Sequence, residues 1–360
     1  MKKISTILFI ALMVLITSIS IITLYTTKKF EKAFADGTSF IAMEKETGRV
    51  LSGSNIHEKK FMASTTKILT AITVIENASL TDVVTVTEKT VGIEGSSMYL
   101  EAGEKISVKS LLFGLMLRSG NDSAETLACY LCGSIEKFSE LMNKTAQKIG
   151  TKNSNFTNPH GLHDDNHYTT AYDLALISCY AMKNDDFREI VSTKKVTVEW
   201  TTRDYDRVLY NKNKMLSTYD GATGIKTGYT KKAGRCLVSS ALKNGMEVIT
   251  VVLNCPNMWQ KSSELLDSSF KDYSLKLVAS KNDFIGFLDI NGDEEKCGLY
   301  IKNDITVPIK ESEENLLKID YEYPKTINKP FKKDTAFGKV NIYVSNNLIF
   351  SEKIYTIIGK

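Results

Sequence analysis

A serine and a lysine at the start of an apolar run constrain this chain more than any other feature. Ser64 and Lys67 are separated by two residues, and the side chains that follow have helical apolar spacing: Ile68, Leu69, Ile72 and Ile75. Three positions are close to one helical turn, so the hydroxyl and the amine share a face. A serine hydroxyl is activated when a neighbouring base takes its proton. A lysine amine is such a base when burial or a second cation lowers its pKa.

Backbone N–H groups at the start of this helix could stabilise negative charge on a substrate oxygen, so the sequence predicts nucleophilic chemistry at Ser64. The Ser-x-x-Lys spacing alone does not single out this serine, because it recurs at Ser134/Lys137, Ser192/Lys195, Ser240/Lys243 and Ser268/Lys271. The choice of Ser64 therefore depends on the motifs that follow it along the chain.

The charge of the chain argues against a nucleic-acid partner. Five lysines and one glutamate in residues 1–35 account for the formal charge of +4 of all 360 residues. The remainder is close to neutral and carries no basic footprint for a phosphate backbone. We therefore expect no nucleic acid among the partners.

Residues 1–35 are predicted to be a signal peptide or an N-terminal membrane anchor. Lys2 and Lys3 precede an apolar stretch at 7–24, and Ala33-Phe34-Ala35 is a small-x-small cleavage site. The apolar stretch is almost long enough to span a bilayer, and charged residues 28–32 separate it from the cleavage site. Cleavage and retention both stay open, and both place the rest of the chain outside the cytoplasm.

Six cysteines in an exported chain suggest disulfides. Cys236 and Cys255 lie on two predicted neighbouring strands and could pair, although the connectivity stays open. Cys129 and Cys132 lie in an apolar helical run. We interpret them as buried structural thiols on one helix face rather than as a redox or metal pair.

The first half of the chain predicts strands around packed helices. Residues 38–52 alternate like two strands with a turn at Thr47-Gly48, and 83–86 could be a short strand. Ser107 is a predicted N-cap for an apolar, buried helix at 108–117. A further helix is expected at 123–131. The polar loop between these two helices would present side chains rigidly, Ser119 and Asn121 among them.

A polar segment after residue 150 contains His160, His163 and His167 together with two aspartates. Its spacing matches no zinc pattern, so we interpret it as a solvated loop and expect no metal. Thr170 and Asp173 resemble a capping box, with aspartate in place of glutamate. Asp173 is therefore expected to cap a helix rather than to act in catalysis.

The second half predicts a hairpin, one more helix and a β module. Asn244-Gly245 joins two apolar alternating runs at 236–242 and 248–253, which is a strong hairpin signal. A helix is expected at 262–279. From residue 280 onward, alternating residues at 317–323 and 340–344 predict a small all-β domain. The fold class is therefore α/β (α+β), a mainly antiparallel sheet with packed helices at 36–279 and a β-rich domain at 280–360.

Lys226-Thr227-Gly228 occurs once. On a strand, Lys226 and Thr227 face opposite sides, and Gly228 would let a substrate backbone approach closely. Lys226 could be the second cation that lowers the pKa of Lys67, and Thr227 could bind a carboxylate.

Taken together, three motifs appear in one chain in the order Ser64-x-x-Lys67, Ser119-Gly120-Asn121 and Lys226-Thr227-Gly228. This set resembles that of the penicillin-binding serine acyl-transferases. The flanks are similar to those of the low-molecular-mass D-alanyl-D-alanine carboxypeptidases: Met62-Ala63, Gly95-Ser96-Ser97, Asp122, His160-Gly161-Leu162, Gly224-Ile225 and Tyr229-Thr230. The likeness spans about residues 38–275 closely and the β module more loosely, and it implies the penicillin-binding/β-lactamase-like transpeptidase fold with a helical subdomain.

The resemblance implies a role for each matching residue. Ser64 would attack the carbonyl between the two terminal D-alanines of a peptidoglycan pentapeptide, with Lys67 as base. Ser119 would relay a proton to the leaving amine, and Asn121 would orient Lys67 and the substrate amide. The terminal carboxylate would meet Lys226 and Thr227, and the N–H groups of Ser64 and Tyr229, beside Gly228, would form the oxyanion hole.

The family also implies β-lactam inhibitors and no cofactor. Two alternatives remain: a class A-like β-lactamase, which needs a deacylating glutamate that we do not find at 150–175, and a non-catalytic penicillin-binding sensor.

Ser123 stands where many relatives have alanine. The last residues do not form the amphipathic helix that anchors some relatives, which favours an N-terminal anchor or a released form. The sequence does not distinguish carboxypeptidase action from endopeptidase action on cross-links.

Overall fold

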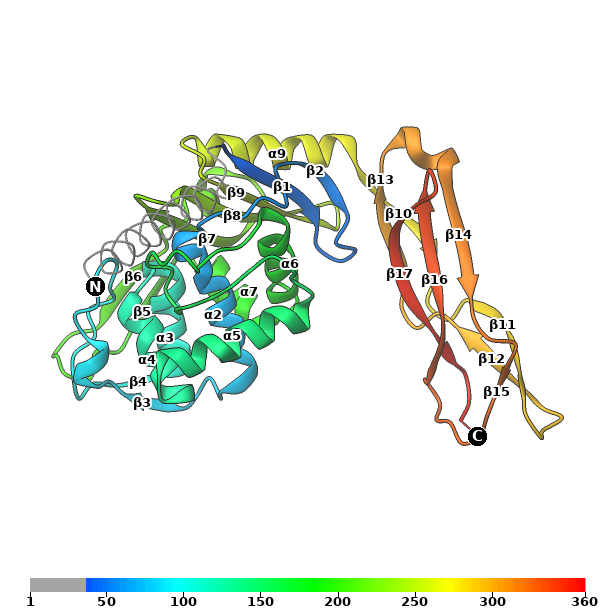
Figure 1. Cartoon of the computed structure of the whole chain (residues 1–360), viewed down its shortest axis with the longest axis horizontal. Helices are drawn as coiled ribbons and strands as arrows, with labels where there is room; N and C mark the ends of the chain where they lie inside the picture. The colour runs from blue at the N-terminus through cyan, green and yellow to red at the C-terminus, as the bar shows by residue number, and fades with distance from the viewer. Residues whose placement is uncertain (1–36, 360) are drawn as a thin grey trace, which may run out of the picture.

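Alternating stretches from both ends of the first region pair into one antiparallel sheet (Figure 1). The computed structural model describes residues 37–359. Its central sheet has the order β2-β1-β9-β8-β7, formed by β1 (Ser39–Glu44), β2 (Val50–Ser54), β7 (Ala222–Thr230), β8 (Gly234–Lys243) and β9 (Met246–Leu253). The predicted strands at 38–52 and the hairpin at Asn244-Gly245 are confirmed. Both turn residues have positive φ, 51° and 80°, as a tight hairpin turn requires.

Helices cover both faces of this sheet (Figure 1). α9 (Met258–Asp272) lies on one face, over a core that contains Leu237, Val252 and Leu266. A larger core fills the other face. Its helices are α2 (Lys67–Asn77), α3 (Val108–Phe113), α4 (Asn121–Cys132), α5 (Ile135–Ile149), α6 (Ala171–Ala181) and α7 (Asp185–Ser192), while the short α8 (Met215–Thr218) precedes β7. The paired strands β3 (Val83–Thr85) with β4 (Lys105–Ser107), and β5 (Lys195–Val198) with β6 (Arg207–Tyr210), complete this region.

α2 runs through the middle of the helical layer. Every residue from Lys67 to Val74 is buried, and Ile68, Leu69 and Ile72 are at most 1% exposed. Full burial of each such side chain stabilises the fold by about 1.5–3 kcal/mol relative to exposure. This packing fixes the position of Lys67, the first residue of α2.

The predicted N-caps are confirmed, but the capping box is not. The Ser107 hydroxyl accepts a hydrogen bond from the N–H of Ser110, and Thr170 accepts one from the N–H of Asp173. The Asp173 carboxylate does not return to the N-cap. It accepts from the Asn153 N–H and the Ser154 hydroxyl, both at 2.7 Å, and so ties the preceding loop to α6.

The predicted helix at 262–279 is wrong in the part that follows Asp272. α9 ends at Asp272, and residues Ser274–Ala279 form β10, which pairs with β13 (Ile305–Ile309). Alternating Leu275 and Leu277 suit a strand once a partner is present, and β13 comes from a distant part of the chain. We propose that the division between the two regions falls at Tyr273 rather than after residue 279.

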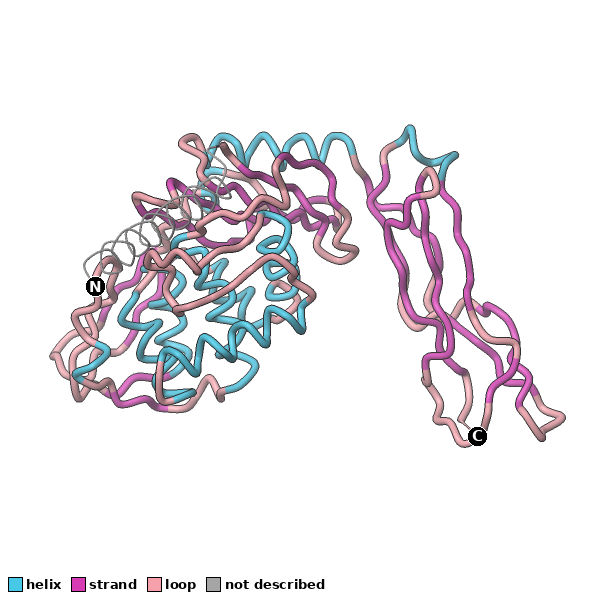
Figure 2. The backbone as a smooth tube through the Cα atoms, in the orientation of Figure 1, coloured by secondary structure: helices cyan, strands magenta, loops and turns pink. Residues whose placement is uncertain are grey.

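The C-terminal region is built of strands, as the alternation at 317–323 and 340–344 predicted (Figure 2). A second sheet has the order β14-β16-β17-β12-β11-β15 and its own apolar core, separate from the first region. Its members are β11 (Phe284–Ile290), β12 (Lys296–Tyr300), β14 (Leu317–Glu322), β15 (Thr326–Ile327), β16 (Ala336–Val344) and β17 (Asn347–Thr356), with a 3-10 helix, η4 (Glu311–Leu316), before β14.

All six cysteines are free thiols, so the expectation of disulfides is wrong. Cys236 belongs to the core under the helical layer, whereas Cys255 belongs to the core under α9. The two side chains therefore pack into different cores, and their sulfurs are not bonded. Burial raises the pKa of the Cys236 thiol to about 12. Cys129 and Cys132 are half-buried rather than buried.

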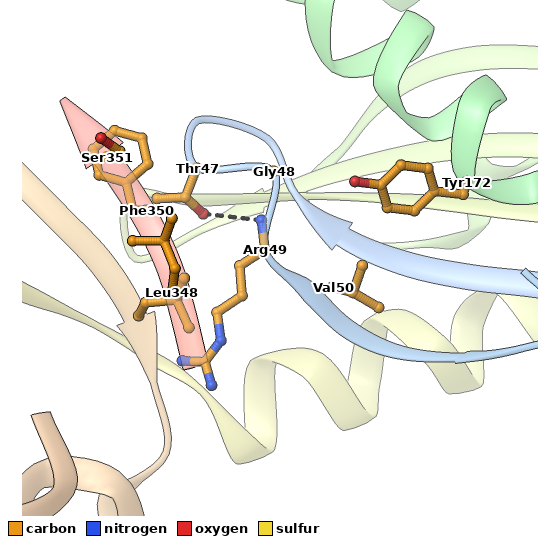
Figure 3. Close-up of a pocket in the computed structure, with 9 residues that line it drawn as sticks. Thr47, Gly48, Arg49, Val50, Tyr172, Leu348, Phe350 and Ser351 are labelled. Carbon is orange, nitrogen blue, oxygen red and sulfur yellow. Dashed lines mark hydrogen bonds between the residues drawn. The ribbon is translucent and has the colours of Figure 1, made fainter. Parts of the chain in front are cut away.

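Arg49, from the turn between β1 and β2, joins the two regions. Its guanidinium donates to the carbonyl oxygen of Pro308 and, at 2.7 Å, to the carboxylate of Glu313. It also lies 5.3 Å from the ring centroid of Tyr273. Beside it, an open groove of about 500 Å³ separates the regions (Figure 3), lined by Thr47, Gly48, Val50, Tyr172 and residues 348–351.

We predict that Arg49→Met loosens the contact between the two regions. The variant loses two charge-assisted hydrogen bonds of a largely buried group, at a cost of about 2 kcal/mol. In limited proteolysis, residues 272–280 of the variant should be cut at least about tenfold faster than those of wild type, while both cores stay folded. Lys296→Met, which removes an ion pair between exposed partners outside the cleaved segment, is the matched control and should leave the rate unchanged. Equal rates for wild type and Arg49→Met would contradict this role.

Candidate active site

Ser64 lies in a tight turn directly before α2. This turn, η1 (Ala63–Thr66), is a 3-10 helix, and Ala63 has the left-handed φ of 48°. Such a conformation is strained for a residue with a side chain and is held only by its surroundings. Ser64 itself is half-buried, so its hydroxyl is accessible to a substrate while its neighbours are packed.

The amine of Lys67 faces the Ser64 hydroxyl, with 3.1 Å between Nζ and Oγ. The Lys67 side chain is fully buried. Its Nζ also donates to Oδ1 of Asn121 and to the carbonyl oxygen of His160, both at 2.7 Å. Those two oxygens are acceptors only, so they take the two hydrogens of a neutral amine. The lone pair is then left for the hydroxyl of Ser64.

The environment of Lys67 favours this neutral form. Burial lowers the pKa of its amine well below the ordinary value, and the charges of Lys226 and Lys212 lower it further. The carboxylate of Asp122 opposes these effects. The predicted second cation, Lys226, is therefore present and acts in the expected direction.

β7 brings the Lys-Thr-Gly motif against the turn that holds Ser64. Lys226 is 1% exposed and donates to the carbonyl oxygen of Thr227 at 3.0 Å. Burial and the charge of Lys212 lower the pKa of Lys226 to about 7. A side chain on Gly228 would come within 3.0 Å of the Ser64 nitrogen, so glycine permits this close approach.

Ser119 and Asn121 flank a break between two helices. α3 continues as a π-helical turn, η3 (Gly114–Arg118), and Ser119 follows with a left-handed φ of 64°. Asn121 is the first residue of α4 rather than part of a loop, and its side chain bonds to Lys67. Within residues 37–359 no hydrogen bond joins the buried Ser119 hydroxyl to Ser64, Lys67 or Lys226.

The structure therefore brings Ser64, Lys67 and Asn121 into direct contact, with Lys226 close enough to affect the Lys67 amine. Thr227 is half-buried on β7, and Tyr229 is 66% exposed at the end of the motif.

A buried carboxylate that the sequence analysis assigned no role organises one wall of the site. Asp122 is 1% exposed and accepts from the N–H groups of Met98 and Leu100, both at 3.1 Å, and from the hydroxyl of Ser97. These bonds fold the 94–100 loop over α4. The Asn121 side-chain amide donates to the carbonyl oxygen of Glu94 in the same loop.

Lys212 was also missed. Its amine donates to the hydroxyl of Ser96 at 2.9 Å and lowers the pKa of both Lys226 and Lys67. Nothing in the local sequence marks this lysine, because it lies in an irregular segment after β6. Only the fold places it beside the site.

The histidine segment is only partly the solvated loop that the sequence suggested, with His163 and Asp165 exposed. His160 and His167 are 7% and 2% exposed. His160 Nε2 lies 3.3 Å from the Glu125 carboxylate, and its carbonyl oxygen binds Lys67. Across residues 37–359, no three His, Cys, Asp or Glu side chains are arranged to hold a metal ion.

A serine hydroxyl facing a buried lysine amine, beside a Lys-Thr-Gly strand, defines a serine-type peptidase of the penicillin-binding class. A solved structure of penicillin-binding protein 5 from Haemophilus influenzae superposes with a TM-score of 0.75 at 29% identity, covering 89% of this chain and 96% of that one. The chain belongs to the D-alanyl-D-alanine carboxypeptidase family, whose model matches residues 26–257. A second model, the C-terminal domain of penicillin-binding protein 5, matches residues 273–357.

Two curated relatives and one further structure agree with this assignment. The D-alanyl-D-alanine carboxypeptidase DacF of Bacillus subtilis is 30% identical over 348 residues, covering 94% of this chain and 89% of the relative. DacC of Escherichia coli is 31% identical over 337 residues, with 89% and 83% covered. A mutant of the Streptomyces K15 DD-transpeptidase has a TM-score of 0.62 at 32% identity, covering 65% of this chain and 97% of that one. The predicted family and fold class are thus confirmed.

We predict that folding stability falls in mild acid because of His167. Burial lowers the pKa of its imidazole to about 3, so below pH 6.5 the unfolded chain binds a proton that the folded protein does not. The free energy of unfolding should drop by about 1.4 kcal/mol per pH unit between pH 6 and pH 4 from this group. In urea titrations across this range, the free energy of unfolding of His167→Gln should fall less steeply with decreasing pH than that of wild type. Parallel curves would contradict the assignment.

Proposed function

We propose that the protein is a serine D-alanyl-D-alanine carboxypeptidase that removes the terminal D-alanine from peptidoglycan stem peptides through an acyl-enzyme on Ser64. The observation that supports this most directly is the contact of 3.1 Å between the Lys67 amine and the Ser64 hydroxyl. Both other partners of that amine are acceptors. The base is thereby oriented toward the nucleophile before substrate arrives.

In the proposed acylation step, Lys67 takes the proton of Ser64 as the oxygen attacks the carbonyl between the two D-alanines. The negative charge that develops on the carbonyl oxygen is bound by the N–H groups of Ser64 and Tyr229. The close packing of Gly228 against the Ser64 nitrogen supports this assignment, because it sets the two donors on adjacent backbones.

The leaving amine needs a proton, and we assign its relay to Ser119. The left-handed conformation of this buried residue, between η3 and α4, is the kind of strain found at functional sites. Asn121 keeps Lys67 in place and is positioned to contact the substrate amide. Water then hydrolyses the acyl-enzyme and releases the shortened peptide, without a cofactor.

The terminal carboxylate is proposed to bind Lys226 and Thr227, with Lys212 contributing charge from the side of Ser96. A carboxylate here would restore full protonation of Lys226, whose pKa is about 7 in its absence. β-Lactams, which also carry a carboxylate beside a reactive amide, are proposed to acylate the same serine.

Two other functions predict a different behaviour toward penicillin or a pentapeptide. A class A-like β-lactamase would turn penicillin over rapidly, yet residues 150–175 contain no glutamate to activate the deacylating water. A non-catalytic penicillin-binding sensor would be acylated but release no D-alanine from a pentapeptide. The direct contacts among Ser64, Lys67 and Asn121 favour an active enzyme.

The site of action is proposed to be outside the cytoplasm, at the cell wall or the outer face of the membrane. The predicted signal peptide or anchor, with its predicted cleavage site after Ala35, lies outside the described residues, and we propose that it makes the membrane contact. Among residues 37–359, no helix is both long enough and apolar enough to cross a bilayer.

We predict that Ser64→Ala lowers D-alanine release by about 10⁴–10⁶-fold, as expected for loss of a serine nucleophile. Stability should change by less than about 1 kcal/mol, because one half-buried hydroxyl is removed. Peptide mass spectrometry after exposure to penicillin should place the adduct on the peptide that contains Ser64. An adduct on any other peptide would overturn the proposed function.

We predict that Lys226→Met moves the acid limb of the pH profile for penicillin acylation to higher pH. Removing a cation raises the pKa of Lys67, so its neutral form requires more alkaline conditions. Lys212→Met should shift the limb in the same direction by less, because Lys212 affects Lys67 less than Lys226 does. The exposed Lys231→Met is the matched control and should leave the profile unchanged. A shift to lower pH in Lys226→Met would contradict Lys67 as the base.

A further inference from the structure

A chain of three hydrogen bonds connects the buried imidazole of His167 to the backbone of the nucleophile turn. Nδ1 of His167 accepts from the N–H of Thr157 at 3.0 Å. Nε2 lies 2.7 Å from the Thr66 hydroxyl, which is 2.8 Å from the carbonyl oxygen of Ala63. His167 and Thr66 are 2% and 0% exposed, so water does not compete with these bonds.

The N–H of Thr157 fixes which group donates in each hydrogen bond of this chain. A backbone N–H can only donate, so Nδ1 of His167 must carry a lone pair, and the imidazole is neutral with its proton on Nε2. That proton is donated to the Thr66 hydroxyl oxygen. Thr66 then has its own proton free to donate to the carbonyl oxygen of Ala63.

The carbonyl of Ala63 and the N–H of Ser64 belong to the same peptide group. Because a peptide group is planar, fixing the oxygen also fixes the direction of the N–H. The group is strained, since Ala63 has a φ of 48°, and it needs external support. Gly161 supplies a second contact: a side chain at this position would overlap the Ala63 carbonyl.

We propose that His167, acting through Thr66, is a positioning residue that aims the Ser64 N–H at the oxygen of the substrate carbonyl. Donation to the Ala63 carbonyl also polarises the peptide group and makes its N–H a stronger donor. This inference rests on the proposed function, in which Ser64 is acylated and its N–H binds the oxyanion. His167 does not touch substrate.

The same loop supports both halves of the catalytic pair. His160 holds the Lys67 amine through its carbonyl oxygen, and seven residues later His167 holds the nucleophile turn through Thr66. Burial keeps the pKa of His167 near 3, so the imidazole stays neutral and the proton order is kept at working pH.

Thr66→Val and Thr66→Ser test the proposal as a matched pair. Valine has nearly the same shape but can neither accept from His167 nor donate to Ala63, whereas serine can do both. We expect Thr66→Val to lower kcat for D-alanine release about 10–100-fold, somewhat less than the full loss of an oxyanion donor, with KM unchanged. Affinity for a peptide boronic acid, which mimics the tetrahedral intermediate, should fall by the same factor. Thr66→Ser should restore both.

His167→Gln completes a double-mutant cycle with Thr66→Val. If the two residues act in one chain, the double variant should lose no more kcat than Thr66→Val alone. Additive losses, an unchanged kcat in Thr66→Val, or equal changes in KM and kcat would each overturn the proposal. If circular dichroism shows that His167→Gln does not fold, the comparison of Thr66→Val with Thr66→Ser tests the proposal by itself.

The controls separate this inference from the proposed function. Wild-type protein that is not acylated by penicillin at Ser64 would show that the proposed function has failed. If wild-type protein is acylated at Ser64 and Thr66→Val is acylated at the same rate, the role of His167 is overturned. The proposed function then still stands.

Discussion

The site depends on a buried lysine amine to which, among residues 37–359, no carboxylate is bonded. Lys67 is fully buried, and its partners are a hydroxyl, an amide oxygen and a carbonyl oxygen. A charged ammonium in such surroundings is costly, and a neighbouring lysine adds repulsion. These surroundings favour the neutral amine at a cost in stability, and a neutral amine is the form in which lysine can act as a base.

The surrounding architecture holds strained backbone where the chemistry requires it. Ala63 and Ser119 both have left-handed φ values although neither is glycine. Ala63 is supported by Thr66 and Gly161, while the π-helical turn η3 precedes Ser119. Strain of this kind persists only where packing over-determines the conformation. The helical layer on one face of the sheet supplies that packing, and β7 closes the site from the sheet edge (Figure 1).

The C-terminal β region has a separate core and so can be considered a unit with its own stability. Its contact with the first region includes polar bonds of Arg49 to Pro308 and Glu313 and the packing of Leu275 against the core under α9, beside an open groove (Figure 3). Contacts that rely on polar bonds of this kind are typical of regions whose relative orientation can adjust.

The sequence alone determined the features that depend on local order: the ordered motifs from Ser64 to Gly228, the hairpin at Asn244-Gly245 and the caps at Ser107 and Thr170. These depend on spacing and turn chemistry, which a chain carries in itself. Only the tertiary structure decided that β10 is a strand and that Cys236 and Cys255 pack into different cores. It also decided that Asp122 and Lys212 lie near Lys67, and that His167 bonds to Thr66 beside Ser64. Each of these results depends on a partner far away in the chain. A strand needs its neighbour, and burial changes a charge only after the chain has folded around it.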